Sequence, residues 1–428
     1  MRNLTKVIFI SLLILISLSN KAQIAINSPY TRFGLGDISQ TGSGLNKALG
    51  GTAIGYRLSN QINFLNPASY SAQDTLSFIL DFGLNGDIRK LSTAYEEVKR
   101  NNFNMGHFAI SFPINKWWGA SIGVLPYSRI GYNMVVNGTF QNSEDTYSVY
   151  YEGNGNLTKF YIGSGIRIGK HLSVGSNMSY IFGSYSRDRR VRLPSDREGA
   201  AETFYDNSSN IGDVLFNFGV QGFSNVGKNS NLIIGATLDN KTNLNGDFSS
   251  LIIHNYLTID TMESYENLNG NVTIPLRLGI GGTFTYKNKL MFAFDYISQD
   301  WSKAIFFGRK DSLTKSTSLR FGIQYVPVSL MEVKRAPYWK RINLRAGGYY
   351  NNTYLEINGN QVKDYGITFG VGIPWRNEKN LLTKTSFNLA YQIGWKGTLK
   401  DGLVKESYQV FSVGLVLYDF WFIKRKYD

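Results

Sequence analysis

Short segments in which every second residue is apolar recur along most of the chain. In residues 272–286 the apolar positions are Val272, Ile274, Leu276, Leu278, Ile280, Phe284 and Tyr286. Successive side chains of a β-strand point to opposite faces, so each segment has one apolar face and one small or polar face. A soluble sandwich would bury the apolar faces against a second sheet, whereas a membrane β-barrel turns them toward lipid.

From Leu76 onward, this pattern predicts about fourteen strands. They cover residues 76–88, 103–114, 118–137, 145–169, 171–187, 203–225, 230–241, 268–286, 289–306, 314–327, 341–352, 362–374, 384–397 and 405–422. An even number of strands returns both ends of a bacterial single-chain barrel to the periplasmic side. We therefore expect an all-β fold, a transmembrane antiparallel β-barrel over residues 76–422.

The predicted connections alternate between tight turns and longer loops. The tight turns are at 115–116, 169–170, 227–229 and 287–288, and the longer loops are at 89–102, 138–144, 188–202 and 242–267. Short periplasmic turns opposite longer outer loops are typical of outer-membrane barrels. The links 328–340 and 375–383 are longer than this rule predicts. The longest loop, 242–267, is expected either to catch a ligand or to dock a partner.

The N-terminus reads as an export signal. Arg2 and Lys6 precede an apolar run from Val7 to Leu18, and Ala22 supplies a small residue at the expected cleavage site. Such a run is too short for a membrane helix and is typical of a secretory signal peptide, here residues 1–22. The chain has no cysteine, which excludes a lipid-anchored cysteine. An exported chain with many two-faced strands indicates the bacterial outer membrane.

Composition and charge agree with a barrel. The 44 glycines, 27 tyrosines and 27 phenylalanines, with only 9 prolines, suit strands, tight turns and aromatic girdles. The formal net charge of +14 is scattered, so we expect contacts with outer-membrane lipid and lipopolysaccharide rather than with nucleic acid. The last strand ends in the aromatic residues Tyr418, Phe420, Trp421 and Phe422. A short basic tail, residues 423–428, is expected on the periplasmic side.

Residues 23–75 precede the first barrel strand and do not alternate. They are rich in glycine, including Gly50 and Gly51, and end with Asn66, Pro67 and Ala68. A barrel of fourteen strands leaves an open bore unless something fills it, because the lumen widens with strand number. We expect residues 23–75 to form a compact plug inside the lumen. The glycines do not indicate a phosphate loop, because no Gly-Lys-Ser/Thr triplet follows them.

The segment from Gly44 to Ala53, followed by Asn66-Pro67-Ala68 and the first strand, resembles the N-terminal hatch of FadL-type outer-membrane transporters. The Ser-Pro-Tyr-Thr-Arg-Phe-Gly opening at 28–34 and the Lys-Ala-Gln end of the signal resemble the Bacteroidota branch. The resemblance implies a fourteen-stranded barrel with a hatch that carries long-chain fatty acids or other hydrophobic compounds. In that branch, similar barrels also serve as subunits of secretion or outer-membrane assembly machines.

The family resemblance also implies a kinked third strand that opens a lateral gap to the bilayer. In this chain, Leu125, Pro126 and Tyr127 interrupt the third predicted strand and are the candidate lateral gate. Proline lacks the N–H that a β-ladder needs, so it is confined to edges and bulges. The alternative interpretation of Pro126 is a simple strand end or bulge.

Four arginines, each opposite the apolar face of its strand, are candidate ligand-binding cations in the lumen. They are Arg129, Arg277, Arg320 and Arg345. A hydrophobic ligand that carries a carboxylate needs few polar groups in its pocket, and one cation suffices. The alternative is a structural ladder in which the arginines pair with lumen acids such as Asp295.

No enzymatic activity, cofactor or metal is expected. His107 and Ser111 lie on the same face of one predicted strand, but no local motif marks them as a catalytic pair. No cluster of His, Asp and Glu has the spacing of metal ligands.

Three functions are consistent with this sequence. The first is passive uptake of hydrophobic, fatty-acid-like small molecules, which enter from the outer loops, meet the hatch and leave laterally. The second is a barrel that does not transport and instead binds other envelope proteins in a larger secretion or assembly complex. The third is a general porin, which the hatch argues against.

Overall fold

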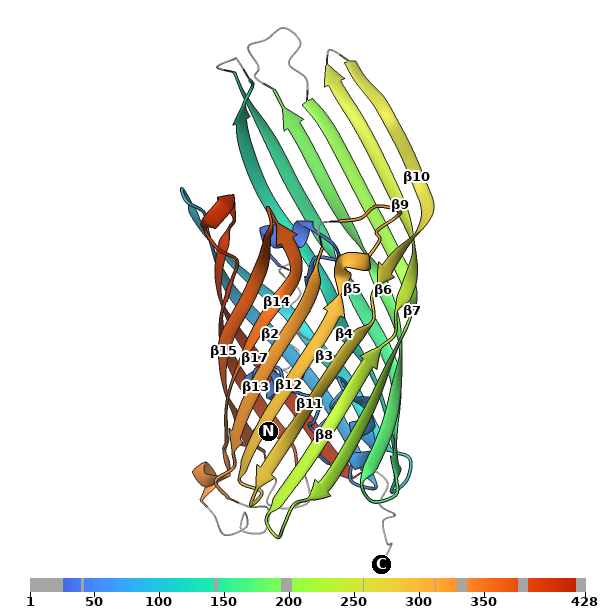
Figure 1. The fold of residues 1–428 in the computed structure, drawn as a ribbon, viewed down its shortest axis with the longest axis vertical. Helices are drawn as coiled ribbons and strands as arrows, with labels where there is room; N and C mark the ends of the chain where they lie inside the picture. The colour runs from blue at the N-terminus through green and yellow to red at the C-terminus, as the bar shows by residue number, and fades with distance from the viewer. Residues whose placement is uncertain are drawn as a thin grey trace, which may run out of the picture.

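Fourteen strands form a closed antiparallel barrel in the computed structural model, which describes residues 26–39, 42–141, 145–193, 202–256, 258–311, 313–328, 337–375 and 384–420 (Figure 1). In wall order the strands are β2 (Ser77–Ser92), β3 (Glu97–Pro113), β4 (Trp118–Thr139), β5 (Thr146–Ile168), β6 (Leu172–Arg192), β7 (Glu202–Asn225), β8 (Ser230–Asp239), β11 (Arg277–Tyr286), β12 (Leu290–Asp300), β13 (Lys315–Tyr325), β14 (Asn343–Ile357), β15 (Asn360–Pro374), β16 (Ser386–Lys396) and β17 (Lys405–Phe420). Each strand pairs with the next, and β17 pairs with β2 to close the ring. The predicted fold class and strand number are confirmed.

The outer wall of the barrel is apolar. Ile162 on β5, Ile280 on β11 and Phe321 on β13 are all exposed, and each belongs to the apolar set of an alternating segment. Large apolar side chains on the surface of a barrel are stable when they contact acyl chains. This belt explains why half of each strand is apolar although the lumen is polar.

No helix in the described part of the chain is long and apolar enough to cross a membrane.

The predicted loop at 242–267 is wrong, because these residues form a β-hairpin. Its strands are β9 (Thr242–Tyr256) and β10 (Thr258–Ile274). β9 follows β8 after two residues and pairs with the upper half of β7, whereas β8 pairs with the lower half. In 243–250 the apolar residues Leu244 and Phe248 share one face, on which Leu244 is buried, and the other face is polar, so the segment lacks the outward apolar face that marks a lipid-facing strand.

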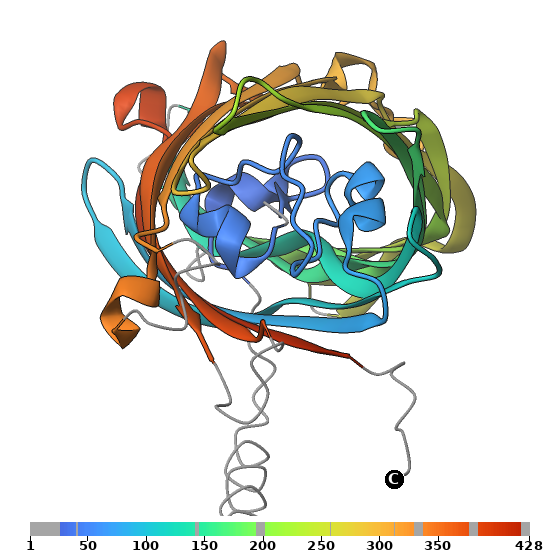
Figure 2. The ribbon, with the colours of Figure 1, turned by 90° about the horizontal axis from the view of Figure 1, so that it is seen from below.

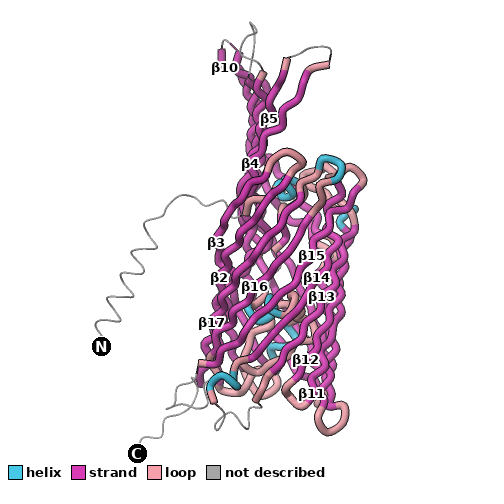
Figure 3. The backbone as a smooth tube through the Cα atoms, turned by 90° about the vertical axis from the view of Figure 1, so that its left-hand side faces the viewer, coloured by secondary structure: helices cyan, strands magenta, loops and turns pink. Residues whose placement is uncertain are grey.

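The hairpin is part of a sheet that rises above the barrel. The upper parts of β4, β5, β6 and β7 pair in this order and continue through β9 to β10 (Figures 1 and 3). We call these six upper segments the extension. On its outward face the aromatic residues Phe160 and Phe182 give way to Asn156, Ser184 and Asn210 higher up. The change from aromatic to small polar residues marks the upper limit of the apolar belt.

The N-terminal residues 26–72 lie inside the ring of strands (Figure 2). They contain the 3-10 helix η1 (Pro29–Arg32), the short strand β1 (Asp37–Ile38), the helix α2 (Gly44–Ala48) and the 3-10 helix η2 (Pro67–Ala72). Ser43 and Asn46 form a capping box that starts α2. Asn66 caps η2, and Pro67 occupies its first position. We call residues 26–72 the hatch. Three more 3-10 helices, η3 (Trp301–Lys303), η4 (Tyr338–Arg341) and η5 (Lys400–Gly402), lie in connections between strands.

A row of glycines in the barrel wall receives η2. Gly119, Gly165, Gly175 and Gly219 are register partners on β4, β5, β6 and β7. A Cβ atom at Gly165 would lie 2.3 Å from the carbonyl oxygen of Pro67, and one at Gly119 would lie 2.2 Å from that of Tyr70. Only a wall without side chains at this height lets the hatch backbone approach so closely.

A second group of glycines receives the end of α2 on the opposite wall. Added Cβ atoms at Gly322, Gly347 and Gly370 would lie within 2.7 Å of atoms of Leu49, Gly50 and Ala48, respectively. The hatch is thus held between two glycine seats, one on β4–β7 and one on β13–β15.

Replacing Gly219 with alanine is expected to destabilise the seated hatch. The new methyl group would lie 2.1 Å from Oδ1 of Asn66. Overpacking of this kind costs about 1–3 kcal/mol. Urea unfolding in detergent micelles, followed by tryptophan fluorescence, measures the loss. Gly222→Ala on the same strand is the matched control, because its Cβ would lie 4.0 Å from the nearest atom. Equal stability of the two variants would contradict the seat.

Candidate functional site

The pairing between β3 and β4 stops partway up the barrel. It covers six residue pairs, from Pro113–Gly119 to Phe108–Val124. Above Val124, β3 continues with β2 alone, and β4 continues with β5. We call this interruption the seam.

Pro126 gives the seam a physical cause. The Trp118 carbonyl accepts from Ile114, so the even-numbered residues of lower β4 direct their backbone groups toward β3. The next residue of this set after Val124 is Pro126, which has no N–H to donate. A β-bulge follows between Pro126 and Ser128, and β3 has a bulge at Gly106. Pro126 therefore ends the β3–β4 ladder without ending β4 itself.

The hatch takes the place of β3 along the first part of this edge. β1 pairs with β4 through Asp37–Arg129 and Ile38–Ser128. Ser39 donates its N–H to the Tyr127 carbonyl at 2.9 Å, and Ser28 donates to the Gly131 carbonyl at 2.8 Å. Backbone groups that β3 leaves unpaired are thus satisfied from inside the barrel.

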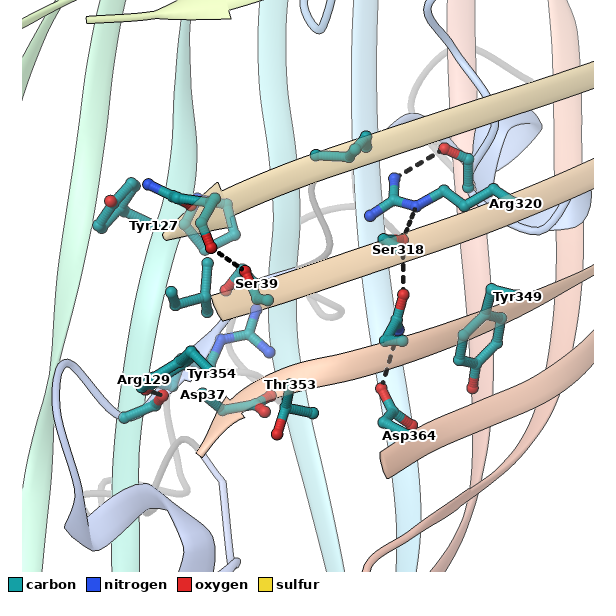
Figure 4. A pocket seen from close by; sticks show the side chains of 18 of the residues that line it. Asp37, Ser39, Tyr127, Arg129, Ser318, Arg320, Tyr349, Thr353, Tyr354 and Asp364 are labelled. Atoms are coloured by element: carbon teal, nitrogen blue, oxygen red, sulfur yellow. Dashed lines mark hydrogen bonds between the residues drawn. The ribbon is translucent and has the colours of Figure 1, made fainter. Parts of the chain in front are cut away.

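A cavity of about 320 Å³ lies beside the seam, between the hatch and the wall. Residues of the seam on β3 and β4 line it, namely Asn104, Gly106, Pro126, Tyr127 and Arg129. Three of the four predicted lumen arginines, Arg129, Arg277 and Arg320, line the same cavity. Figure 4 shows Arg129 and Arg320 in it. Position opposite the apolar face therefore identified three side chains, from β4, β11 and β13, that line one cavity.

Each acid that lines the cavity has a polar partner. Asp37 pairs with Lys396 at 2.8 Å, Asp239 with Arg277 at 3.1 Å, and Asp87 with Arg89 at 3.4 Å. Asp364 accepts from the Tyr408 hydroxyl and from Asn351. A hydrogen-bonded chain through Ser318 and Asn351 links Arg320 to Asp364 (Figure 4).

Four lining cations form no ion pair with a carboxylate in the described part of the chain. They are Lys47, Arg129, Lys159 and Arg320, of which Arg320 donates to the Gly51 carbonyl and to Ser318. Lys47 donates to Asn85, and the Arg129 guanidinium lies 3.5 Å from the Met105 carbonyl across the seam. Lys47 belongs to the hatch, and burial lowers its pKa to about 7, with a further lowering from the charge of Arg129. Cations without a counterion beside an opening make the cavity a candidate anion site.

Arg345 does not line the cavity. Its guanidinium is buried and donates to Gln324 at 2.8 Å and to Asn388 at 2.7 Å. It joins β13, β14 and β16 and packs against Gly372, so its place is structural.

The alternative arginine ladder is not built on Asp295. This carboxylate accepts from the N–H groups of Ala53 and Ile54, at 2.6 and 3.0 Å. Asp295 thus holds the hatch to β12. Its partners are hatch backbone groups that have no sequence signature of their own.

The predicted hatch residues lie where the hatch meets the wall. Gly50 and Gly51 both have positive φ, and a Cβ at Gly50 would lie 2.4 Å from the Gly348 carbonyl. Asn66 donates to the Ile54 carbonyl at 2.8 Å, and Pro67 and Ala68 lie against the glycine row. The predicted signal peptide, residues 1–22, and the basic tail, 423–428, lie outside the described residues.

The predicted gate residues differ in their surroundings. Leu125 is fully buried in a cluster with Ile62 and Phe64 of the hatch. Pro126 and Tyr127 line the cavity, and Tyr127 is the bulged residue of β4. Their gating role stays a prediction.

An apolar cluster forms the roof of the cavity. The ring of Trp301 packs against that of Tyr354 at an angle of 31°, with centroids 5.0 Å apart, and both side chains pack with Tyr30 and Leu35 of the hatch. This roof was not anticipated, because its members come from connections as well as from strands. Lys159 was also missed, although it lies opposite the outward Phe160 and meets the criterion that selected the arginines.

His107 and Ser111 have separate partners. His107 forms a buried pair with Asp81 at 2.8 Å, whereas Ser111 donates to Gln73 and Ala120. His107 therefore joins β3 to β2, whereas Ser111 joins β3 to Gln73 and to β4.

Several solved structures share this architecture. The CymD monoaromatic hydrocarbon channel is 13% identical over 91% of this chain and 99% of its own, with a TM-score of 0.56. The Ralstonia pickettii toluene transporter TbuX is 13% identical over 88% of this chain and 98% of its own, with a TM-score of 0.57. A Pseudomonas aeruginosa FadL homologue is 10% identical over 90% of this chain and 100% of its own, with a TM-score of 0.59. No curated protein matches the sequence.

These structures confirm the FadL-type fold. The chain belongs to the BamG family, whose sequence model matches residues 4–428.

Removing the Asp295 carboxylate is expected to loosen the hatch. Asp295→Ala leaves the N–H groups of Ala53 and Ile54 buried without an acceptor, which costs about 1–3 kcal/mol. Ion conductance in a planar bilayer should rise, and it should rise more when residues 23–60 are deleted. Asp295→Asn keeps an acceptor oxygen and is the control. Conductance that stays unchanged in both the alanine variant and the deletion would contradict a plug.

Proposed function

We propose that this protein is an outer-membrane channel for passive uptake of hydrophobic small molecules, which leave the barrel laterally through the seam. The observation that carries the proposal is the seam beside a cavity: β3 and β4 part above Phe108–Val124, and the cavity lies directly behind. In an ordinary barrel wall both strands would be paired along their length and would separate the lumen from lipid.

The transfer is downhill and needs no energy source. Moving an acyl chain from water into an apolar environment is favourable by about 0.8 kcal/mol per methylene. A ligand caught on the inner face of the extension would pass the apolar roof and reach the cavity. The exposed Phe103 and Met105 on β3 offer an apolar edge on the way out.

The ligand we favour carries one negative charge, as a fatty acid does. Lys47 and Arg129 lie together at the seam end of the cavity without a carboxylate partner among the described residues. They can hold an anionic head group while the chain lies in the seam. Outer-membrane lipid and lipopolysaccharide would surround the wall.

Closing the seam covalently is expected to stop uptake. The chain has no cysteine, so Met105→Cys on β3 and Tyr127→Cys on β4 can be joined by a short thiol crosslinker without background. Uptake of radiolabelled decanoate and of toluene by cells should fall at least tenfold and return after cleavage of the linker.

The matched control joins Val124→Cys to Phe160→Cys, which are already paired on β4 and β5. Uptake that continues through the crosslinked seam, with the hatch in place, would rule out lateral exit here.

Anion binding in the cavity is expected to weaken as pH rises. Lys47 is charged below its pKa of about 7 and loses its charge above it, so one of the two cations beside the seam disappears between roughly pH 6 and 8. Titration calorimetry with decanesulfonate, which stays ionised over this range, should show the loss. Lys47→Met should bind weakly and without this pH dependence. An equal response in the variant would exclude Lys47 from the site.

A second proposed function is a subunit of a larger envelope complex, in which the barrel binds other proteins. The observation that favours it is the extension, six strands wide, which rises beyond the apolar belt (Figure 3). Purification from detergent-solubilised outer membranes separates the two functions. Stoichiometric partners favour the complex, whereas a monomer with lipid or detergent in the cavity favours transport.

A further inference from the structure

The upper part of β4 is a strand edge without a partner in the described part of the chain. β3 has left β4 below this point, and the hatch pairs with the edge only as far as Gly131. From Asn133 to Thr139, β4 pairs with β5 on one side alone. This stretch lies above the apolar belt, in the extension.

The direction of its backbone groups follows from two hydrogen bonds. Phe140 donates its N–H to Asp145 across the β4–β5 turn, whereas Gly131 accepts from Ser28 on the opposite side. The backbone N–H and C=O groups of even-numbered residues therefore point toward β5, and those of odd-numbered residues point away from it. The outward-facing set is Asn133, Val135, Asn137 and Thr139.

The other edge of the extension, on β10, and the facing edge of β3 carry the features that protect an edge. β10 has bulges at Met262 and near Asn267, and its upper part carries Asp260, Glu263 and Glu266. The upper part of β3 carries Glu97, Lys99 and Arg100. Charges and bulges on an edge strand discourage the addition of another strand.

The β4 edge lacks every one of these protections. Residues 130–139 contain no charged residue and no proline, and the register with β5 is regular from Ser128 to Thr139. Val135 and Val136 are 49% and 50% exposed on opposite faces of the strand. A long, regular, uncharged edge is the form that accepts a further strand.

We propose that Asn133–Thr139 of β4 is a docking site at the cell surface for an extended segment of another polypeptide, which adds to the extension as a seventh strand. The molecule already uses this edge in the same way, because β1 of the hatch pairs with it just below. The incoming segment is largely uncharged, with apolar side chains over Val135 on one face and Val136 on the other. The site stands apart from the transport proposal, and a barrel that carries no ligand could have it equally.

A second copy of the chain does not fit this edge. Two copies in one membrane are related by an axis along the membrane normal, so both β4 strands rise in the same direction with the same edge facing inward. Barrel strands tilt by about 35–45°, so the two edges would cross rather than run alongside each other. Even without tilt, each residue of one copy would lie at the same height as the identical residue of the other copy. N–H groups would then face N–H groups, whereas in a parallel ladder each N–H must face a carbonyl.

Amide hydrogen exchange tests the proposal directly. In native outer-membrane vesicles, the N–H groups of Asn133, Val135, Asn137 and Thr139 should exchange at least tenfold more slowly than in the purified protein in lipid nanodiscs. Met134 and Val136 face β5 and should exchange slowly in both. Equal exchange of the outward-facing set in vesicles and nanodiscs would overturn the proposal.

A substitution pair distinguishes backbone pairing from side-chain contact. Val135→Pro removes one outward N–H and leaves the β4–β5 ladder in place, so a photo-crosslinker at position 137 should lose its polypeptide adduct in vesicles. Val135→Thr keeps the N–H and the branched shape and should keep the adduct. Unchanged heat-modifiable migration on gels shows that both variants fold. Retention of the adduct in Val135→Pro would exclude strand addition, whereas its loss in both variants would indicate side-chain contact instead.

Discussion

A chain that crosses a membrane as strands must give every backbone N–H and C=O a partner, because lipid offers none. This barrel meets the requirement strand by strand, except where Pro126 removes the donor that β4 would direct toward β3. The hatch supplies the missing partners as far as Gly131. The position of β1, the cavity behind it and the free edge above it all follow from this one break in the ladder.

Much of the barrel could be predicted because lipid imposes a simple pattern. Segments such as 277–286 and 386–395 must alternate, and their strands lie where the alternation predicts them. The predicted strand 268–286 is wrong in its first part, because residues 268–274 belong to β10, where Val272 and Ile274 are buried. The hairpin β9–β10 could not be found in this way, because it lies above the belt, where the outward face meets water and its apolar residues, such as Leu244 and Val272, are buried on the inner face. An outward apolar face therefore predicts only those strand segments that lie within the bilayer.

The cavity was predictable in part. A cation opposite the apolar face of its strand is expected to face the lumen, and this rule correctly places Arg129, Arg277 and Arg320 in one cavity. The same rule applied to lysines gives Lys159. It failed for Arg345, because facing inward does not distinguish an open cavity from a packed contact with Gln324 and Asn388. The glycine seats depend on cross-strand register, which links Gly165 to Gly175 and Gly175 to Gly219. A single sequence does not reveal such alignments.

The hatch, the seam and the extension lie at successive levels along the barrel axis. The glycine seats and Asp295 fix the hatch in the lumen, the seam lies at the top of the apolar belt, and the extension stands beyond it. A barrel organised in this way can pass a ligand sideways at one level and bind a protein at another. The two proposals therefore do not compete for the same residues.

Access from lipid to the lumen through the seam is the central claim, and quenching by brominated lipids measures it. A single fluorophore on Asn104→Cys lies on the cavity wall beside the seam, and one on Thr368→Cys lies on the lumen face of β15, which is paired on both sides. In liposomes of lipids brominated high on the acyl chain, the account predicts strong quenching at position 104 and little at 368. Equal protection of both positions would contradict an opening to the bilayer.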